Sequence, residues 1–415
     1  MIGMNKFEKV SHRRASRVVR FIHKDGSAVA NKKVRFKQTN HEFLFGCGAF
    51  DLNEYFLPWN EDKKEHFKER MDLWTDLFNY GTLPFYWGGY EPQEGKVFWE
   101  SRMAAAKYMK ERGIEVKGHP LCWHTACANW LMEYDNETIL KKQLERIGRD
   151  VTQFKGVIDK WDVINEVVIM PDFDKYDNAI TRICKEYGRV NLIKKVFEEA
   201  KAANPNAVLL LNDFNTSVSY EILIDGALSA GAPIDVIGIQ SHQHQGYWGA
   251  EKVHRVLERF EKFGLPIHFT ENTLVSGDLL PAHIVDLNDF QTDVWASTPE
   301  GEERQMQQWE EMYRILFEHP LVEAVTGWDF ADGMWLNAPS GVIHKDNTVK
   351  PVYRRLKELI KGEWWTDEEV CTDEDGRVRL EGFKGEYILV WGEGKETKLT
   401  LTEGMEKETE VIVVE

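Results

Sequence analysis

The middle of the chain alternates short apolar runs with longer amphipathic segments. From about residue 41 to 361 the short runs are rich in β-branched and aromatic residues, and the longer segments place apolar residues at helical spacing. Eight short runs predict strands, over residues 41–48, 81–87, 114–120, 157–166, 207–213, 234–242, 265–271 and 324–330. The clearest helical patterns cover residues 61–78, 99–112, 136–154, 178–203 and 299–319.

Eight strands that alternate with helices predict an α/β fold, a (β/α)8 TIM barrel with a parallel sheet closed on itself. An open doubly wound sheet would show the same alternation. The first predicted strand is not followed by G-x-G-x-x-G, so a dinucleotide-binding fold is disfavoured.

The two ends of the chain follow a different pattern. Residues 16–38 and 369–415 form short alternating runs with Asp-Gly turn signals, which is typical of antiparallel strands. Neither stretch has enough strands to bury a core alone, so we expect them to pair into one small β-sandwich module. The predicted domains are a barrel at 41–361 and an accessory β-sandwich made of 11–40 with 365–415.

Composition narrows the class of ligand. The 415 residues are 42% hydrophobic and include 15 Trp, which is enough for a large core. With 52 basic and 69 acidic residues the net charge is −17, which argues against nucleic acid or an anionic membrane as a partner. A carbohydrate or another small polar ligand fits better. The oligomeric state is left open. The five cysteines are scattered and odd in number, which predicts free, mostly buried thiols rather than a disulfide framework.

The chain start bears on location. The first residues, MIGMNKFEKVSHRRAS, lack the apolar run of a secretory signal, and nowhere do 18 apolar residues run together. These observations predict a cytoplasmic protein, or a secreted one whose leader has been removed.

Several predicted strands end in polar or acidic residues, and in a barrel these ends open on one face. Asn165 and Glu166 end one apolar strand, and Glu271 ends another. Two carboxyl groups are the minimum for glycoside hydrolysis, because one attacks the anomeric carbon while the other protonates the departing oxygen. The charge of Glu271 should raise the pKa of Glu166 and keep it protonated. A salt-bridged strand end is the alternative for Glu166.

A series of motifs runs through the core in a fixed order. They are FLFGCGAF, YEPQEGKVFW, KGHPLCWH, WDVINEV, LNDFN, IDVIGIQSH, HFTEN, TGWDFADGMW and DNTVKPVY. This order resembles glycoside hydrolase family 10, the β-1,4-xylanase family, over about residues 41–361. The resemblance implies a retaining β-glycosidase with Glu166 as acid/base and Glu271 as nucleophile. It implies no cofactor or metal, and xylose-containing or decorated plant β-glycan oligosaccharides as substrates.

The resemblance also implies a set of sugar contacts. Asn165 would donate to the sugar 2-hydroxyl, and Gln240 and His242 would support the nucleophile. Aromatic and histidine side chains would line the groove; these are His119, Trp123, Trp328, Trp335, Tyr86 and Trp87. His244 is expected in solvent, whereas Asn212 and Asp213 either cap the next helix or face the cleft.

Three departures from the family pattern stand out. The E-N-x-x-K-W run is replaced by Thr82, Leu83 and Tyr86, followed by Trp87. Ala126 stands in place of the Gln after W-H, and Thr273 in place of the Asp of T-E-x-D. Side chains that would hydrogen-bond the glycone sugar one step beyond the reacting unit are thus lost, while Glu166 and Glu271 are kept. We therefore expect plain xylan not to be the best substrate, and a decorated or short oligosaccharide to suit better.

The same residues allow other interpretations. A family-10-like glycosidase of different sugar specificity is one alternative, and a non-catalytic sugar-binding or inhibitor barrel is another, disfavoured because Glu166, Glu271 and Asn165 all remain. A zinc site is disfavoured because strand alternation would scatter its candidate ligands, which are His119, His124, Cys122 and Cys127. In the terminal module Trp391 and Tyr387 could form a sugar platform, but packing against the barrel is expected.

Overall fold

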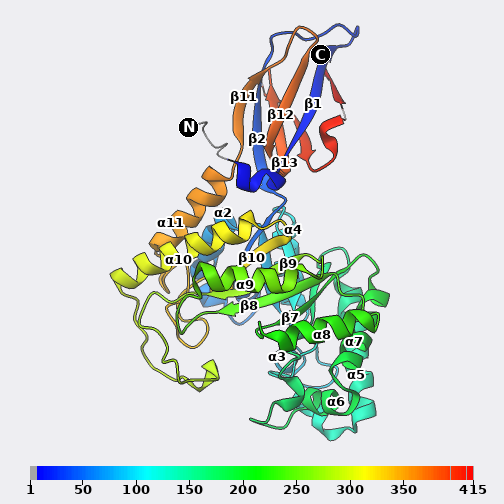
Figure 1. Cartoon of the computed structure of the whole chain (residues 1–415), viewed down its shortest axis with the longest axis vertical. Coiled ribbons are helices and arrows are strands. Elements are labelled where there is room, and N and C mark those ends of the chain that lie inside the picture. Colours follow the sequence, from blue (N-terminus) through cyan, green and yellow to red (C-terminus); the bar gives the residue numbers. More distant parts are fainter. Residues whose placement is uncertain (1–6, 393, 408, 415) are drawn as a thin grey trace. The chain divides into compact units, whose positions relative to one another are not determined.

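The computed structural model describes residues 7–392, 394–407 and 409–414. The chain divides into two compact units (Figure 1). One contains Phe45–Leu316 and Leu321–Tyr353, and the other contains Met1–Leu44, Phe317–Pro320 and Arg354–Glu415.

The larger unit is built on a closed barrel of parallel strands, as predicted. Its strands are β3 (Leu44–Gly48), β4 (Tyr80–Pro84), β5 (Glu115–His119), β6 (Lys160–Asn165), β7 (Val208–Asp213), β8 (Val236–His242), β9 (Ile267–Thr273) and β10 (Val322–Gly327). They follow one another around the barrel in chain order, and β10 closes on β3. Almost every strand residue is buried, because side chains fill the barrel on one face and helices cover the other.

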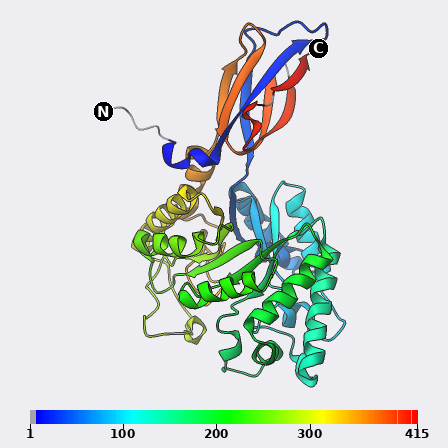
Figure 2. The same ribbon diagram turned by 45° about the vertical axis from the view of Figure 1, so that its right-hand side comes forward.

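Amphipathic helices surround the strands (Figure 2). They are α1 (Phe50–Tyr55), α2 (Lys64–Leu77), α3 (Trp87–Tyr90), α4 (Glu100–Lys110), α5 (Asn136–Phe154), α6 (Ala179–Tyr187), α7 (Arg189–Ala203), α8 (Val218–Ser229), α9 (Gly249–Glu261), α10 (Pro299–Glu318) and α11 (Pro351–Glu358). The prediction of one helix over 178–203 is wrong. Gly188, at φ +77°, ends α6 and begins α7, a backbone conformation that glycine adopts without strain.

Shorter helical turns complete the chain. They are η1 (Glu8–Arg13), η2 (Glu61–Lys63), η3 (Asn129–Glu133), η4 (Met170–Asp172), η5 (Leu287–Asp289), η6 (Leu359–Glu363) and η7 (Met405–Lys407). Among the described residues, every helix is too short or too polar to cross a bilayer. The five cysteines are free thiols; Cys47, Cys122, Cys127 and Cys184 are buried and Cys371 is exposed.

The smaller unit contains two sheets from the two ends of the chain, which confirms the predicted β-sandwich module. One sheet has the order β12 (Arg377–Phe383), β1 (Arg14–His23), β15 (Thr409–Val414). The other has the order β11 (Asp367–Cys371), β2 (Lys33–His41), β13 (Gly385–Trp391), β14 (Lys395–Leu401). The expectation of antiparallel pairing throughout is wrong in one place, because β1 pairs with β15 in parallel.

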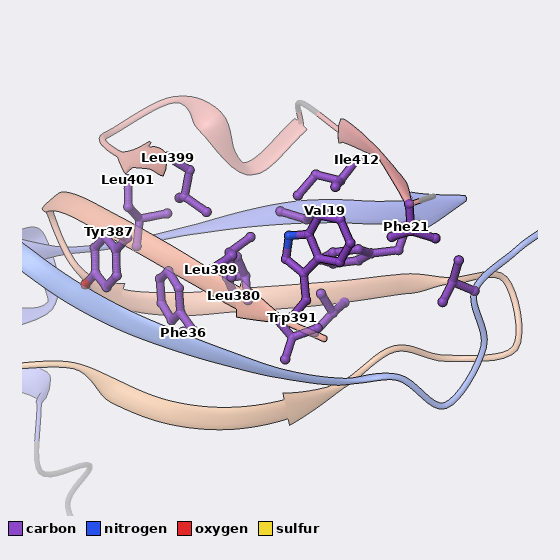
Figure 3. Close-up of a cluster of buried hydrophobic side chains, with 14 of the residues drawn as sticks. Val19, Phe21, Phe36, Leu380, Tyr387, Leu389, Trp391, Leu399, Leu401 and Ile412 are labelled. Carbon is purple, nitrogen blue, oxygen red and sulfur yellow. The ribbon is translucent and has the colours of Figure 1, made fainter. Parts of the chain in front are cut away.

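The core of this module lies between its two sheets (Figure 3). Phe36 and Tyr387 stack with ring centroids 4.0 Å apart, and Phe21 meets Trp391 edge-on at 6.0 Å. Tyr387 and Trp391 are both buried in this cluster. They therefore pack inside their own module, and neither forms an exposed sugar platform.

Candidate active site

Both candidate catalytic acids lie at the C-terminal mouth of the barrel. Glu166 follows β6 directly, and Glu271 lies in β9 beside Gln240 of β8. Glu166 adopts φ +58°, and its backbone N–H donates to the carbonyl of Asn212 at 2.9 Å. A left-handed conformation costs a non-glycine residue about 1 kcal/mol or more. Strain of this kind at a strand end is typical of a functional position.

Three amide side chains connect the two carboxyl groups. Gln240 Nε2 donates to Asn165 Oδ1 at 2.9 Å and to Glu166 Oε1 at 3.2 Å. Asn212 Nδ2 donates to the same Asn165 oxygen at 2.8 Å and to Glu271 Oε1 at 2.7 Å. A continuous hydrogen-bonded chain therefore runs from Glu166 to Glu271. It brings together four residues that the sequence predicts for the site, and Asn212 joins them.

The two carboxyl groups differ in their partners. Glu166 accepts hydrogen bonds from Trp123 Nε1 at 2.9 Å and Asn165 Nδ2 at 3.1 Å, and no ion pair joins it to another described residue. The alternative of a salt-bridged strand end is therefore wrong. Glu271 instead lies beside two histidines, with His242 Nε2 3.1 Å from its Oε2 and His119 Nδ1 3.8 Å from its Oε1.

These surroundings move the two pKa values in opposite directions. Burial, together with the nearby charge of Glu271, raises the pKa of Glu166 to about 8. Burial alone would also raise the pKa of Glu271, but the electrostatic influence of His119 and the hydrogen bond from His242 hold it below its usual value. One protonated and one ionised carboxyl near neutral pH is the division of roles that acid catalysis beside a nucleophile requires.

A buried charged cluster lies beneath Glu271. The Asp162 carboxylate lies 2.7 Å from Lys117 Nζ and 2.7 Å from His119 Nδ1. The side chains of Lys117 and Asp162 are fully buried. Possible ligand atoms of His119, Asp162 and Glu271 lie within 4.8 Å of one another. The ammonium of Lys117 already supplies the positive charge that Asp162 needs, so these residues fit an internal ion pair better than a metal site. Among the described residues, His124, Cys122 and Cys127 form no such group.

Aromatic rings gather around these histidines. The Tyr86 ring lies 5.6 Å from Trp123 and 5.8 Å from His119. Trp328 lies 5.3 Å from His119, and the Trp335 ring lies 4.7 Å from His242. Four of the predicted aromatic residues are thus brought to the mouth of the barrel, where indole and phenol rings offer apolar faces to a sugar.

Trp87 is not brought into the site. It is only 3% exposed, its indole donates to Glu91 Oε2 at 3.0 Å, and the Arg146 guanidinium lies 4.8 Å from its ring centre. We therefore assign Trp87 a packing role, and its prediction as a substrate contact is not supported by its position.

Counting along the motif misplaced Leu83 as well. Leu83 is fully buried. Gly81 lies two residues earlier on the same face of β4, and that face meets Trp74 and Met109 of the surrounding helices. Because side chains alternate along a strand, Leu83 faces the helices rather than the groove. Tyr86, by contrast, contacts His119 and Trp123 of the site.

The structure places three further residues that the sequence singles out around the site. Thr273 Oγ1 lies 3.4 Å from His242 Nδ1 and 3.3 Å from His244 Nδ1, so this hydroxyl stands where the family pattern has a carboxylate. His244 is fully buried, so the solvated loop position expected for it is wrong; burial, with a smaller effect of His242, lowers its pKa to about 3. Asp213 accepts the backbone N–H groups of Val168 and Asn215 and so fixes the loop that follows Glu166.

Lys117 and Asp162 were missed, although a signal was present. Lys117 and His119 are two residues apart, so alternation places both on one face of the apolar strand β5, and Asp162 interrupts the apolar run of β6. A charged residue on the interior face of each of two adjacent strands predicts a buried ion pair. Asn212, left open between a cap and the cleft, belongs to the cleft because it donates to Glu271.

Comparison with known proteins agrees with this arrangement. The model of Glycosyl hydrolase family 10 matches residues 82–359. The chain is 27% identical to Endo-1,4-beta-xylanase B of Thermotoga neapolitana over 354 residues, which is 81% of this chain and 93% of that protein. It is 24% identical to Anti-sigma-I factor RsgI6 of Acetivibrio thermocellus over 387 residues, which is 91% of this chain but only 45% of that protein.

The fold is shared with solved structures. Xylanase 10B from Thermotoga petrophila RKU-1, crystallised in complex with xylobiose, superposes with a TM-score of 0.63 at 24% identity. The match covers 78% of this chain and 95% of that one. Because the family model spans most of the barrel, from β4 to the end of α11, the chain belongs to glycosyl hydrolase family 10.

Proposed function

We propose that the chain is a retaining β-glycoside hydrolase that cleaves xylose-containing or related plant β-glycan oligosaccharides. One observation carries the proposal. Two buried carboxyl groups share one hydrogen-bonded network, and their pKa values are moved apart, with that of Glu166 raised and that of Glu271 lowered. Membership of the family supports the same reaction.

In the first step a carboxylate oxygen of Glu271 attacks the anomeric carbon. The bond from that carbon to the glycosidic oxygen breaks, its electron pair stays on the oxygen, and Glu166 transfers its proton there. The products are a glycosyl ester on Glu271 and a leaving group with a free hydroxyl. Esterification removes the negative charge of Glu271, so the pKa of Glu166 should fall and leave it ready to act as a base.

In the second step Glu166 takes a proton from water while the water oxygen attacks the anomeric carbon. The ester bond breaks, Glu271 leaves as a carboxylate, and Glu166 is again protonated. Two inversions give a sugar with its original configuration. Water is the only co-reactant that the cycle consumes.

The remaining residues would bind and orient the sugar. Asn165 is held by Asn212 and Gln240, so its amide group is fixed beside both acids. We assign it to the 2-hydroxyl, where a hydrogen bond that strengthens in the transition state favours catalysis. Trp123, Trp328 and Tyr86 would enclose the glycone sugar.

The choice of sugar rests on relatives. The proteins named as endo-1,4-beta-xylanases, and the xylobiose complex, support xylose. The chain spans less than half of the anti-sigma factor, so that protein's name says nothing about hydrolysis here. Tyr86, an aromatic residue in a stretch where the family has charged and amide side chains, favours decorated or short substrates over plain xylan.

A trapping experiment tests the mechanism. A 2-deoxy-2-fluoro-β-xylobioside with a dinitrophenyl leaving group should inactivate the enzyme, and mass spectrometry of the digested protein should find the label on Glu271. Glu271→Gln should remain unlabelled. Turnover of 4-nitrophenyl β-xylobioside with the label on another residue would overturn the assignment. Binding of xylo-oligosaccharides without turnover of any β-glycoside would favour a sugar-binding barrel instead.

A further inference from the structure

The connection after β9, residues 274–298, is long and is fastened to neighbouring loops (Figure 1, yellow-green). The amide of Gln245, in the loop after β8, donates to the carbonyls of Pro281 at 3.0 Å and Ile284 at 2.7 Å. The backbone N–H of Leu280 donates to the carbonyl of His244 at 2.9 Å. This connection is therefore held over the ends of the strands.

An ion pair links the connection after β9 to a further loop at the mouth of the barrel. Lys175, in the loop between β6 and α6, places its ammonium 2.6 Å from Asp286 Oδ2 and 2.6 Å from Asp289 Oδ1. Asp286 directly precedes the short turn η5 and Asp289 is its last residue, and Asp286 Oδ1 also accepts the backbone N–H of Asn288 at 2.9 Å. We call Lys175, Asp286 and Asp289 the clasp.

One end of the clasp lies close to the surroundings of Glu271. Trp335 donates from its indole nitrogen to Asn288 Oδ1, inside η5, at 3.2 Å. The Trp335 ring packs on His242, which bonds to Glu271. Two side chains therefore separate the turn η5 from the candidate nucleophile.

The other end lies close to the surroundings of Glu166. Tyr176, next to Lys175 in the chain, packs its ring on Phe173 at 4.8 Å, and Phe173 packs on His124 at 4.6 Å. His124 follows Trp123, which donates to Glu166. The clasp thus bridges from the loop after the acid/base strand to the loop after the nucleophile strand.

The order of the strands around the barrel shows which side of its mouth the clasp spans. β7 and β8 lie between β6 and β9, so the clasp joins loops on either side of these two strands. The residues assigned to the glycone sugar, Tyr86, His119 and Trp123, follow or belong to β4 and β5, beyond β6 in the other direction. The leaving group must therefore lie toward β7 and β8, on the side that the clasp spans.

We propose that the clasp bounds the leaving-group side of the groove, so that the enzyme accepts a compact leaving group, one sugar or one aromatic ring, instead of a long glycan chain. This inference rests on the proposed function. It also makes Lys175, Asp286 and Asp289 specificity-determining residues that never touch the reacting atoms.

Two aromatic side chains on the side of the mouth that the clasp spans fit such a leaving group. Tyr176 and Phe214, the residue after β7, are each about half exposed, at 48% and 47%. Aromatic faces left exposed beside a carbohydrate site suit one stacked ring. Ion pairs that are partly exposed to solvent add little to the stability of a fold, so the clasp should govern access to the groove more than folding.

Chain-length selectivity tests the clasp. The probe is the ratio of kcat/KM for xylohexaose to kcat/KM for 4-nitrophenyl β-xylobioside, in the wild type, Lys175→Met and the control Lys160→Met. Lys160 pairs with Glu115 at 2.7 Å at the N-terminal ends of β6 and β5, the opposite end of the barrel. Lys175→Met should raise the ratio by about threefold to fivefold, which is the range that loss of a partly exposed ion pair allows, while Lys160→Met leaves it unchanged.

A charge-reversed variant keeps the test independent of a general folding effect. Lys175→Asp combined with Asp286→Lys and Asp289→Lys restores opposite charges and should return the ratio toward the wild-type value. An unchanged ratio in Lys175→Met, or a wild type that cleaves the middle of xylohexaose as efficiently as it cleaves the aryl substrate, overturns the inference. If the wild type turns over neither substrate and Glu271 is never labelled, the proposed function itself fails.

Discussion

The core of the β-sandwich and the centre of the barrel are built on opposite principles. The sandwich fills the space between its sheets with apolar and aromatic side chains such as Phe36, Leu380 and Leu389. The barrel instead buries charged groups beside one another, with Asp162 between Lys117 and His119 and with Glu271 next to that histidine.

The difference between the two cores is informative because burying a charged side chain costs free energy. Removing a charge from water costs several kcal/mol, which pairing offsets only in part or at best fully, and apolar residues of the same volume are often as stable or more so. The sandwich shows that this chain can fill a core without ions. The charges in the barrel are therefore best explained by the chemistry that they make possible at Glu166 and Glu271.

The largest expected effect is the loss of the nucleophile. Glu271→Ala should lower kcat by about 10⁴-fold or more, because no carboxylate remains to form the ester. Steady-state kinetics with 4-nitrophenyl β-xylobioside measure this. Glu115→Ala, which removes an exposed carboxylate at the other end of the barrel, should leave kcat within about twofold. A small effect of Glu271→Ala would mean that the barrel charges are structural only.

The next effect compares the two cores directly. Asp162→Ala should destabilise the fold by about 3–5 kcal/mol, because Lys117 is left buried and unpaired. Leu380→Ala in the sandwich should cost about 2–5 kcal/mol through a cavity. Calorimetry and urea unfolding measure both. Only Asp162→Ala should also lower kcat/KM, since Asp162 holds His119 beside Glu271; equal kinetic effects would erase the distinction between the two regions.

The pH profile follows from the two pKa shifts. Glu166 must carry its proton, so kcat/KM should fall about tenfold per pH unit above its pKa of about 8. Glu271 must be ionised and its pKa lies below the usual 4.5, so the acidic decline should begin only below that value. Glu166→Gln, assayed with a dinitrophenyl glycoside that needs no protonation, should lose the alkaline decline. A wild-type decline centred near pH 5 would contradict this assignment.

The smallest effect concerns the hydroxyl that stands where the family pattern has a carboxylate. Thr273→Val removes the hydroxyl that lies 3.4 Å from His242 Nδ1 while keeping the shape of the side chain. A lost hydrogen bond of about 1 kcal/mol corresponds to about a fivefold fall in kcat/KM. Thr270→Val is the matched variant on β9. It removes a hydroxyl that donates to Asn212 and leaves the surroundings of His242 unchanged. No change in Thr273→Val would show that packing and the bond to Glu271 orient His242 without the hydroxyl.

The sequence predicts the barrel well because its signals are local. Each β/α repeat shows its own periodicity, and acids at strand ends must converge once the barrel closes. The break at Gly188 was hidden because both flanking segments are helical. Leu83 was misplaced because a motif count ignores the direction of side chains along a strand.

Other parts of the site depend on contacts between distant segments. His244 is buried by Trp335 and Trp295, which come from later loops, and the clasp joins Lys175 to residues more than a hundred positions away. The hydrophobic pattern around His244 or Lys175 does not predict which distant residues each will contact. These features become visible only when the loops are placed around the mouth of the barrel.

The most direct test of the account follows the anomeric form of the product. Proton NMR of 4-nitrophenyl β-xylobioside during hydrolysis should show the β-anomer of xylobiose forming first, with the α-anomer growing later by mutarotation, because Glu271 and Glu166 act in two successive inversions. If the α-anomer forms first, the two carboxyl groups do not act by double displacement, and the central claim is wrong.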